Sequence, residues 1–139
     1  MTKMQTNIQQ RRAAFALSQV QAVAEKCSPE VQKRFKAYSN SFPAMMQMNG
    51  IGQALAFAYQ KSNGETDENR GWQLIFQVCQ RWLLEHSTIW QSPSEPLMNV
   101  LTTGSQEQYQ LAQAEVQALF SWVKDFARAE IKGDVSPGE

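Results

Sequence analysis

The chain has 139 residues, a length typical of one domain, and 42% of them are hydrophobic, which is enough to form a real core. It contains no run of about 18 apolar residues, which excludes a membrane-spanning helix. The first residues lack the apolar region of a signal peptide, so we expect a cytoplasmic protein without a membrane partner.

The formal net charge is zero, but the charge is unevenly distributed along the chain. Residues 1–61 contain eight Lys and Arg against two Glu, which gives +6, whereas residues 62–139 contain five against eleven acidic residues, which gives −6. A basic half of this kind can face an anion such as nucleic acid. It can also pair with the acidic half of a neighbouring copy, or simply form a dipolar, solvated surface. The charge alone leaves these interpretations open.

Apolar residues recur at helical spacing throughout the chain, and no segment alternates strictly as a strand would. A first helix is expected over 5–27, with its buried stripe formed by Ala13, Leu17, Val20, Ala24 and Cys27. Ser28 and Pro29 then provide an N-cap and a first-turn proline for a second helix. We expect Val31, Phe35 and Tyr38 on one face of that helix. Pro43 is expected to restart the chain as a short helical piece over 44–48.

Gly50 and Gly52 flank a single residue after this piece, and they raise the question of a phosphate-binding loop. A dinucleotide fingerprint needs a preceding strand and a third glycine, but the preceding residues favour a helix and Leu55 occupies the third position. A P-loop also needs a Gly-Lys-Ser or Gly-Lys-Thr sequence, which is absent. We therefore predict a joint between helices, with Gly50 in left-handed αL geometry and Gly52 allowing a partner to approach closely.

The second half continues the helical pattern. A short helix is expected over 53–61, with Ala54, Leu55, Ala58 and Tyr59 at helical spacing, and a mobile loop over 62–69. The next helix is amphipathic, with an apolar stripe of Trp72, Ile75, Phe76, Cys79, Trp82 and Leu83. A two-turn helix should end at Gly104 in αL geometry, and a Ser105–Gln108 capping box should open a last helix over 106–132. We expect Val116, Leu119, Val123 and Phe126 to face inward on that helix. The prediction is an all-α fold: one compact domain of about six helices over 1–132, followed by a flexible tail over 133–139.

The sequence offers little for catalysis. His86 is the only histidine and there is no CxxC pair, so we predict no metal site, no catalytic residue and no cofactor. His86 is expected to be solvated near a helix end, which leaves a hydrolase as a remote alternative. Cys27 and Cys79 are expected to be free, buried thiols of a reduced compartment.

Basic and apolar side chains provide the candidate contact residues. Lys and Arg on helix faces can bind phosphates without reading sequence. The candidates for RNA contact are Arg11, Arg12, Lys26, Lys33, Lys36 and Lys61. Lys124, Arg128 and Lys132 form a further stripe, which favourable interaction with the helix C-terminus also explains. Methionines suit adaptable packing surfaces, and Trp90 adjoins a proline-containing loop, where we expect it to be exposed. The candidates for subunit contact are Met45, Met48, Gln53 and Trp90.

Three blocks of the chain carry a family resemblance. They are RRAAFALSQV (11–20), YSNSFPAMMQMNGIGQALAFAYQK (38–61) and ALFSWVKDFARAEI (118–131). In their order and spacing over roughly residues 9–132 they resemble the helical small subunit of Cmr-type (type III-B) CRISPR RNA-targeting complexes. The central block is the most specific, because a proline leads to Asn49-Gly50-Ile51-Gly52-Gln53 and a short Ala/Leu/Phe helix, with Ile51 in place of the family's usual leucine.

The resemblance implies a non-catalytic protein for antiviral defence, stacked in several copies as the minor filament of a ribonucleoprotein. Its expected partners are other Cmr-complex subunits, further copies of itself, and the backbone of the guide RNA and the target RNA. Sequence would then be read by pairing between guide and target, while basic faces hold phosphates. The alternative is a helical protein–protein adaptor without RNA contact, for which Met45, Met48 and Trp90 would form the contact surface.

Overall fold

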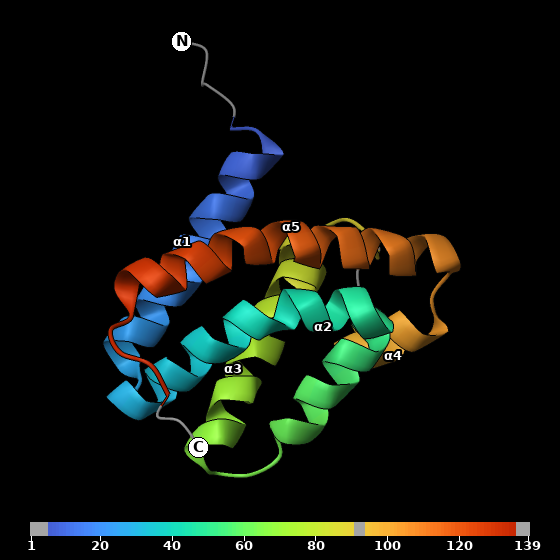
Figure 1. Cartoon of the computed structure of the whole chain (residues 1–139). Coiled ribbons are helices and arrows are strands. Elements are labelled where there is room, and N and C mark those ends of the chain that lie inside the picture. The colour runs from blue at the N-terminus through green and yellow to red at the C-terminus, as the bar shows by residue number, and fades with distance from the viewer. Residues whose placement is uncertain (1–5, 91–93, 136–139) are drawn as a thin grey trace.

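The computed structural model describes residues 6–90 and 94–135, and it contains helices and no strand over these residues (Figure 1). In chain order the elements are α1 (Ile8–Lys26), α2 (Pro29–Lys61), α3 (Asp67–Arg81), the π-helical turn η1 (Trp82–His86), α4 (Leu97–Thr103) and α5 (Gln106–Glu130). The all-α class is confirmed, with five α-helices and one π turn in the described part of the chain in place of about six helices. The expected start of the first helix at residue 5 lies outside the described residues.

The α2 helix is the main departure from the predicted boundaries. The three separate pieces expected between residues 29 and 61 form one element, and Pro43 lies inside it. The prediction that Pro43 restarts the chain was therefore wrong. The interruption is at Gly50, where φ is 82° and ψ is 158°, and the two parts of α2 meet there at an angle (Figure 1). Gly50 has the expected positive φ, but its ψ is far from the αL region, so the predicted αL geometry was wrong.

Contacts with α5 hold this joint in place. The backbone N–H of Gly52 donates to Tyr109 Oη at 2.9 Å, and that of Ile51 donates to Gln113 Oε1 at 3.0 Å. A Cβ atom at Gly52 would lie 3.1 Å from Tyr109 Oη, so the predicted close approach at Gly52 is confirmed. Side chains of α5 thus accept hydrogen bonds from the N–H groups that the break in α2 leaves without helical partners.

The predicted N-caps are confirmed, and α4 ends at Gly104 as expected, but the backbone geometry predicted for that glycine is not found. Ser28 caps α2 ahead of Pro29, and Ser105 forms a capping box with Gln108 at the start of α5. Gly104 has φ −76° and ψ −178°, which is extended backbone, so the prediction of αL geometry was wrong. A capping box between Thr66 and Asn69 starts α3 at Asp67 and makes the preceding loop shorter than the expected 62–69.

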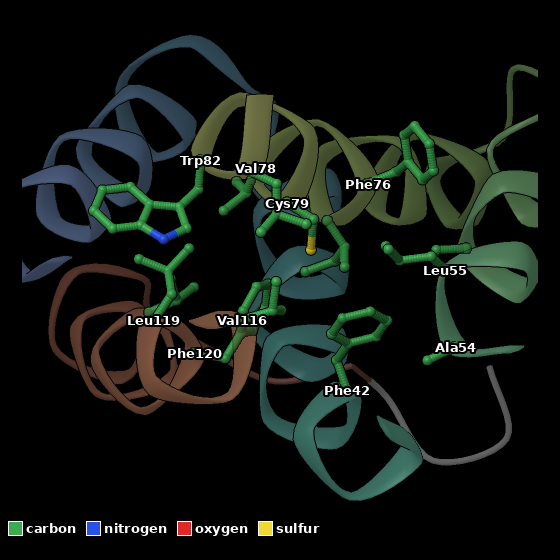
Figure 2. Packing of buried hydrophobic residues seen from close by; sticks show 14 of the residues in the cluster. Phe42, Ala54, Leu55, Phe76, Val78, Cys79, Trp82, Val116, Leu119 and Phe120 are labelled. Carbon is green, nitrogen blue, oxygen red and sulfur yellow. The ribbon is translucent and has the colours of Figure 1, made fainter. Parts of the chain in front are cut away.

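The core lies where α2 packs against both α3 and α5, while α1 packs mainly against α5. Figure 2 shows side chains from these elements pointing toward one another, with the rings of Phe42 and Phe120 at a centroid distance of 5.2 Å. All six residues of the apolar stripe predicted between Trp72 and Leu83, which spans α3 and η1, are buried. Val116, Leu119 and Val123 of α5 are also buried, while Phe126 is half-buried. The stripe of α1 is rotated from the prediction, because its buried residues are Ala16, Val20 and Val23.

Two predictions for individual side chains in this region differ in outcome. Cys27 and Cys79 are both free thiols, as expected, but only Cys79 is buried and Cys27 is half-buried. Burial raises the pKa of the Cys79 thiol far above its ordinary value, which keeps it protonated and unreactive. Tyr59 lies on the predicted face of its helix but remains 59% exposed.

Among the helices of the described residues, none combines the length and the hydropathy that a membrane span requires.

Candidate nucleic-acid interface

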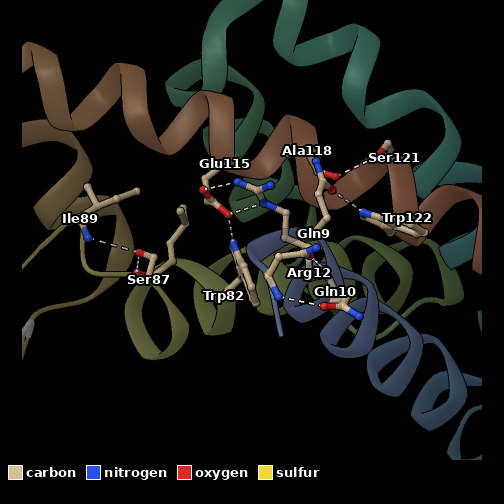
Figure 3. Close-up of polar contacts among 12 residues, drawn as sticks. Gln9, Gln10, Arg12, Trp82, Ser87, Ile89, Glu115, Ala118, Ser121 and Trp122 are labelled. Carbon is tan, nitrogen blue, oxygen red and sulfur yellow. Dashed lines mark hydrogen bonds and ion pairs between the residues drawn. The ribbon is translucent and has the colours of Figure 1, made fainter. Parts of the chain in front are cut away.

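Arg12 is held by a carboxylate within the chain. Its Nε donates to Glu115 Oε1 at 2.8 Å and its Nη2 donates to Glu115 Oε2 at 3.0 Å, while Trp82 Nε1 donates to Oε1 at 2.9 Å (Figure 3). The side chains of Arg12 and Glu115 are only 14% and 19% exposed. This contact joins α1, η1 and α5. Arg12 therefore connects three elements of the fold, and its charge is compensated there.

These hydrogen bonds stabilise the ionised form of Glu115. The bond from Arg12 is the main cause that lowers the pKa of the Glu115 carboxyl, against desolvation, and the bond from Trp82 adds to it. The hydrogen bond to Glu115 likewise raises the pKa of the Arg12 guanidinium. Because the folded pKa of Glu115 lies below its unfolded value, its contribution to stability is complete above the unfolded value. That contribution is lost as the pH falls through the folded pKa.

We therefore expect Glu115→Gln to flatten the acid side of the stability profile. From neutral pH to below the ordinary glutamate pKa of about 4.3, the melting temperature of the native chain should fall more steeply than that of the variant. Glu107→Gln, on the exposed first turn of α5, is the matched control and should follow the native chain. Thermal melts followed by circular dichroism give the comparison. Parallel profiles for the native chain and Glu115→Gln would contradict a lowered pKa.

Lys33 and Lys36 meet Arg128 at a pocket of about 360 Å³, here called the α2–α5 pocket, which Asn40 and Asp134 also line. Lys36 Nζ donates to the carbonyl oxygens of Ile131 at 3.3 Å and Gly133 at 2.9 Å, and it pairs with Asp134 Oδ1 at 3.2 Å. The first residues after α5 are thus bound to α2. The predicted flexibility of 133–139 is untested, and residues 136–139 lie outside the described residues.

The remaining candidates for RNA contact differ in their partners. Lys33 Nζ lies 3.4 Å from Glu30 Oε1, and Lys61 Nζ lies 3.5 Å from Glu68 Oε1 and 5.7 Å from the centroid of the Phe57 ring. Arg11 and Lys26 are exposed and form no ion pair within the described residues. Four of the six candidates thus have a carboxylate partner within the chain.

Lys26 lies beside two cations that the sequence reasoning missed. A pocket of about 230 Å³ between α1 and α3, here called the α1–α3 groove, is lined by Lys26, Arg70 and Arg81 around Val23, Leu74 and Val78. Arg70 and Arg81 lie in residues 62–139, which have a net charge of −6, so the charge distribution along the sequence did not indicate them as candidates. Their spacing of about three helical turns, together with Leu74 and Val78, was the available signal that they share one face of α3.

The candidates for subunit contact divide by exposure. Met48 is 82% exposed and Gln53 is exposed, whereas Met45 is half-buried against the core. Trp90 is 8% exposed, so the expectation that it is exposed was wrong. It packs in the core, and its Nε1 lies 3.0 Å from where a Cβ atom of residue 104 would be. Because Gly104 has no side chain, the indole fits against the end of α4.

His86 ends the π-helical turn and is exposed, as expected. Its ring stacks on Trp82 at a centroid distance of 5.7 Å and lies 4.8 Å from that of Phe15. His86 and Arg11 line a pocket of about 350 Å³ with Ser87 and Glu115. Glu115 is already bonded to Arg12 and Trp82, and the Ser87 hydroxyl donates to Leu83 O at 2.6 Å, so neither is arranged as the partner of a catalytic histidine. No group of three potential metal ligands occurs among the described residues.

Comparison with protein families decides the identity. The family model described as CRISPR-associated protein (Cas_Cmr5) matches residues 8–130, from the start of α1 to the end of α5. The chain belongs to the Cas_Cmr5 family. This confirms the resemblance noted from the sequence and identifies a small subunit of a Cmr-type (type III-B) CRISPR complex. Other subunits of that complex are therefore its partners, and the Cas_Cmr5 family is one of structural small subunits.

Proposed function

We propose that this Cas_Cmr5 protein is a non-catalytic cytoplasmic subunit that stacks in several copies as a minor filament. In this arrangement it holds the backbone of the guide–target RNA in antiviral defence. The observation that carries the proposal is the convergence of Lys33, Lys36 and Arg128 on the α2–α5 pocket, from helices far apart in sequence. Although Lys33 and Lys36 each have a carboxylate partner, the three cations that line the pocket outnumber its one carboxylate, Asp134. Such an excess of positive charge attracts phosphates independently of sequence. Arg11, which is exposed near the start of α1, is a further candidate outside this pocket.

Exposed apolar side chains support the stacking of copies. Met48 and Tyr59 lie on α2 with 82% and 59% exposure, while Ile8 and Leu111 line the pocket beside His86 with 39% and 49% exposure. Two different apolar surfaces suit a heterologous, head-to-tail contact, which repeats into a filament when it does not close. Repeated copies would also raise the RNA affinity of a protein whose own net charge is zero, because each copy adds phosphate contacts.

Reversing the charges of the α2–α5 pocket tests the RNA contact. We expect the Lys33→Glu/Lys36→Glu variant, in the assembled complex, to bind a labelled RNA about tenfold more weakly. Its log affinity should also depend less steeply on log salt, by about one unit for each phosphate that the variant no longer binds. Lys124→Glu/Lys132→Glu makes the same change in net charge outside the six candidates and should have a smaller effect. Binding measured across a salt series gives both quantities.

Two results would oppose this proposal. RNA binding that is unchanged by the Lys33/Lys36 reversals, with the complex still assembled, would reject this face as an RNA contact. If, in addition, Met48→Asp disrupts assembly and no basic variant alters RNA binding, the chain acts as a protein–protein adaptor. The exposure of Met48 is the observation that favours this second function.

A further inference from the structure

The α1–α3 groove differs from the other basic surfaces in how its charges are compensated. Arg70 Nη1 donates to Gln73 Oε1 at 2.7 Å, and Arg81 Nη1 donates to Gln19 Oε1 at 2.7 Å. Amide oxygens orient a guanidinium but leave its charge in place. Lys26, Arg70 and Arg81 form no ion pair within residues 6–90 and 94–135. No carboxylate is among the described residues that line the groove.

The register of the two helices arranges these cations along the groove. Arg70, Leu74, Val78 and Arg81 follow one another on a single face of α3, so Arg70 and Arg81 are separated by about three turns, or about 16 Å. Gln19 and Lys26 lie about two turns apart on α1. Because Gln19 bonds to Arg81, Arg81 lies beside Gln19, and Lys26 lies about two turns further along α1. The groove therefore presents positive charge along its length rather than at a single point.

The chemistry of the groove favours phosphates over an apolar partner. Val23 and Val78 on its floor are only 4% and 2% exposed, so a docking helix would gain little apolar contact there. Guanidinium groups match phosphate oxygens in planar, bidentate hydrogen bonds. The three cations are themselves exposed and can reach a ligand without leaving the fold. A chain of phosphates along the groove could contact each of them in turn.

We propose that the α1–α3 groove is a second RNA-backbone site, in which Lys26, Arg70 and Arg81 bind successive phosphates of one strand. This inference rests on the proposed RNA contact of the subunit, and it adds Arg70 and Arg81 to the binding residues. It also places phosphates on α3, in the half of the sequence that has a negative net charge. The groove binds independently of sequence, because its three cations contact phosphates rather than base edges.

The test compares Arg70→Gln/Arg81→Gln with Lys124→Gln/Lys132→Gln, which removes the same charge outside the groove. Both full-length variants are assembled into the complex and titrated with a fluorescently labelled RNA strand and with the corresponding RNA duplex over a salt series. We expect the groove variant to bind about tenfold more weakly and to lose about one unit of salt slope per arginine removed. The control variant should remain near the native affinity. Circular dichroism melts establish that both variants are folded.

Each outcome distinguishes this inference from the proposed function. If the Lys33/Lys36 reversals weaken RNA binding but the groove variant does not, the groove inference is overturned and the proposed function stands. If neither set of variants alters RNA binding, both are overturned. If the groove variant retains RNA affinity but loses a neighbouring subunit, the groove binds acidic protein instead, and the inference fails. Rescue by Arg70→Lys/Arg81→Lys would support a contact that depends on charge.

Discussion

Replacing Gly50 with alanine is expected to lower the free energy of unfolding by about 3 kcal/mol. The backbone of Gly50, at φ 82° and ψ 158°, is in a region that residues with a side chain rarely adopt. A Cβ atom there would also lie 2.8 Å from Tyr109 Oη. Moving that hydroxyl away would weaken its hydrogen bond from the Gly52 N–H. Urea unfolding followed by tryptophan fluorescence measures the loss.

A double-mutant cycle separates the two causes of this loss. Tyr109→Phe removes the crowding hydroxyl and is expected to cost about 1 kcal/mol, because the Gly52 N–H loses its acceptor. If crowding contributes, Gly50→Ala together with Tyr109→Phe should cost less than the sum of the single variants. Additive costs would attribute the whole effect of Gly50→Ala to backbone strain. A Gly50→Ala variant as stable as the native chain would show that α2 does not need this break.

The Glu115→Ala variant is expected to lose about 2 kcal/mol of stability at neutral pH. The substitution leaves the Arg12 guanidinium and the Trp82 indole N–H without their acceptor between α1, η1 and α5. Removing one partner of a fully buried ion pair costs about 3–5 kcal/mol, and the partial exposure of this pair reduces the effect. Guanidinium chloride unfolding of the full chain provides the measurement.

A double variant that replaces both members of the ion pair shows whether the loss of stability in Glu115→Ala comes from an unpaired charge. Arg12→Met/Glu115→Leu replaces both groups with apolar side chains and should be more stable than Glu115→Ala alone, because no buried charge is left unpaired. Glu107→Ala, in the exposed first turn of α5, controls for the loss of a carboxylate from that helix. If the double variant is no more stable than Glu115→Ala, the stabilising effect of the pair comes from packing rather than from charge.

The helices were predictable where their signals are local. The serine caps at residues 28 and 105 and the periodic apolar stripe of α3 depend on residues within a few turns of one another, and the structure contains all of them. The predictions of a restart at Pro43 and of αL geometry at Gly104 failed because each depended on residue type alone. Pro43 O accepts a hydrogen bond from Gln117 Nε2 at 3.2 Å, and Gly104 lies against Trp90. Tertiary contacts outweighed the local preference at both positions.

The candidate site was only partly predictable, because the sequence shows where the cations lie but not which of them have carboxylate partners. The sequence indicated that positive charge gathers in residues 1–61, and the structure shows that most of the chosen cations have carboxylate partners. Arg12 was chosen as a basic residue on a helix face, yet its guanidinium turns inward to Glu115. Arg70 and Arg81 were overlooked because acidic neighbours in sequence masked them in the charge count.

The sequence by itself determined the all-α class, the capped starts of α2 and α5, the glycine joint and the relationship to the Cas_Cmr5 family. These features depend on periodicity, on caps a few residues apart and on short contiguous blocks. Only the tertiary structure decided which cations remain uncompensated. Arg12 and Glu115 are 103 residues apart in sequence, and Lys36 and Gly133 are 97 apart. Helical spacing tells which side chains share a face, but the partner across that face depends on how the helices pack.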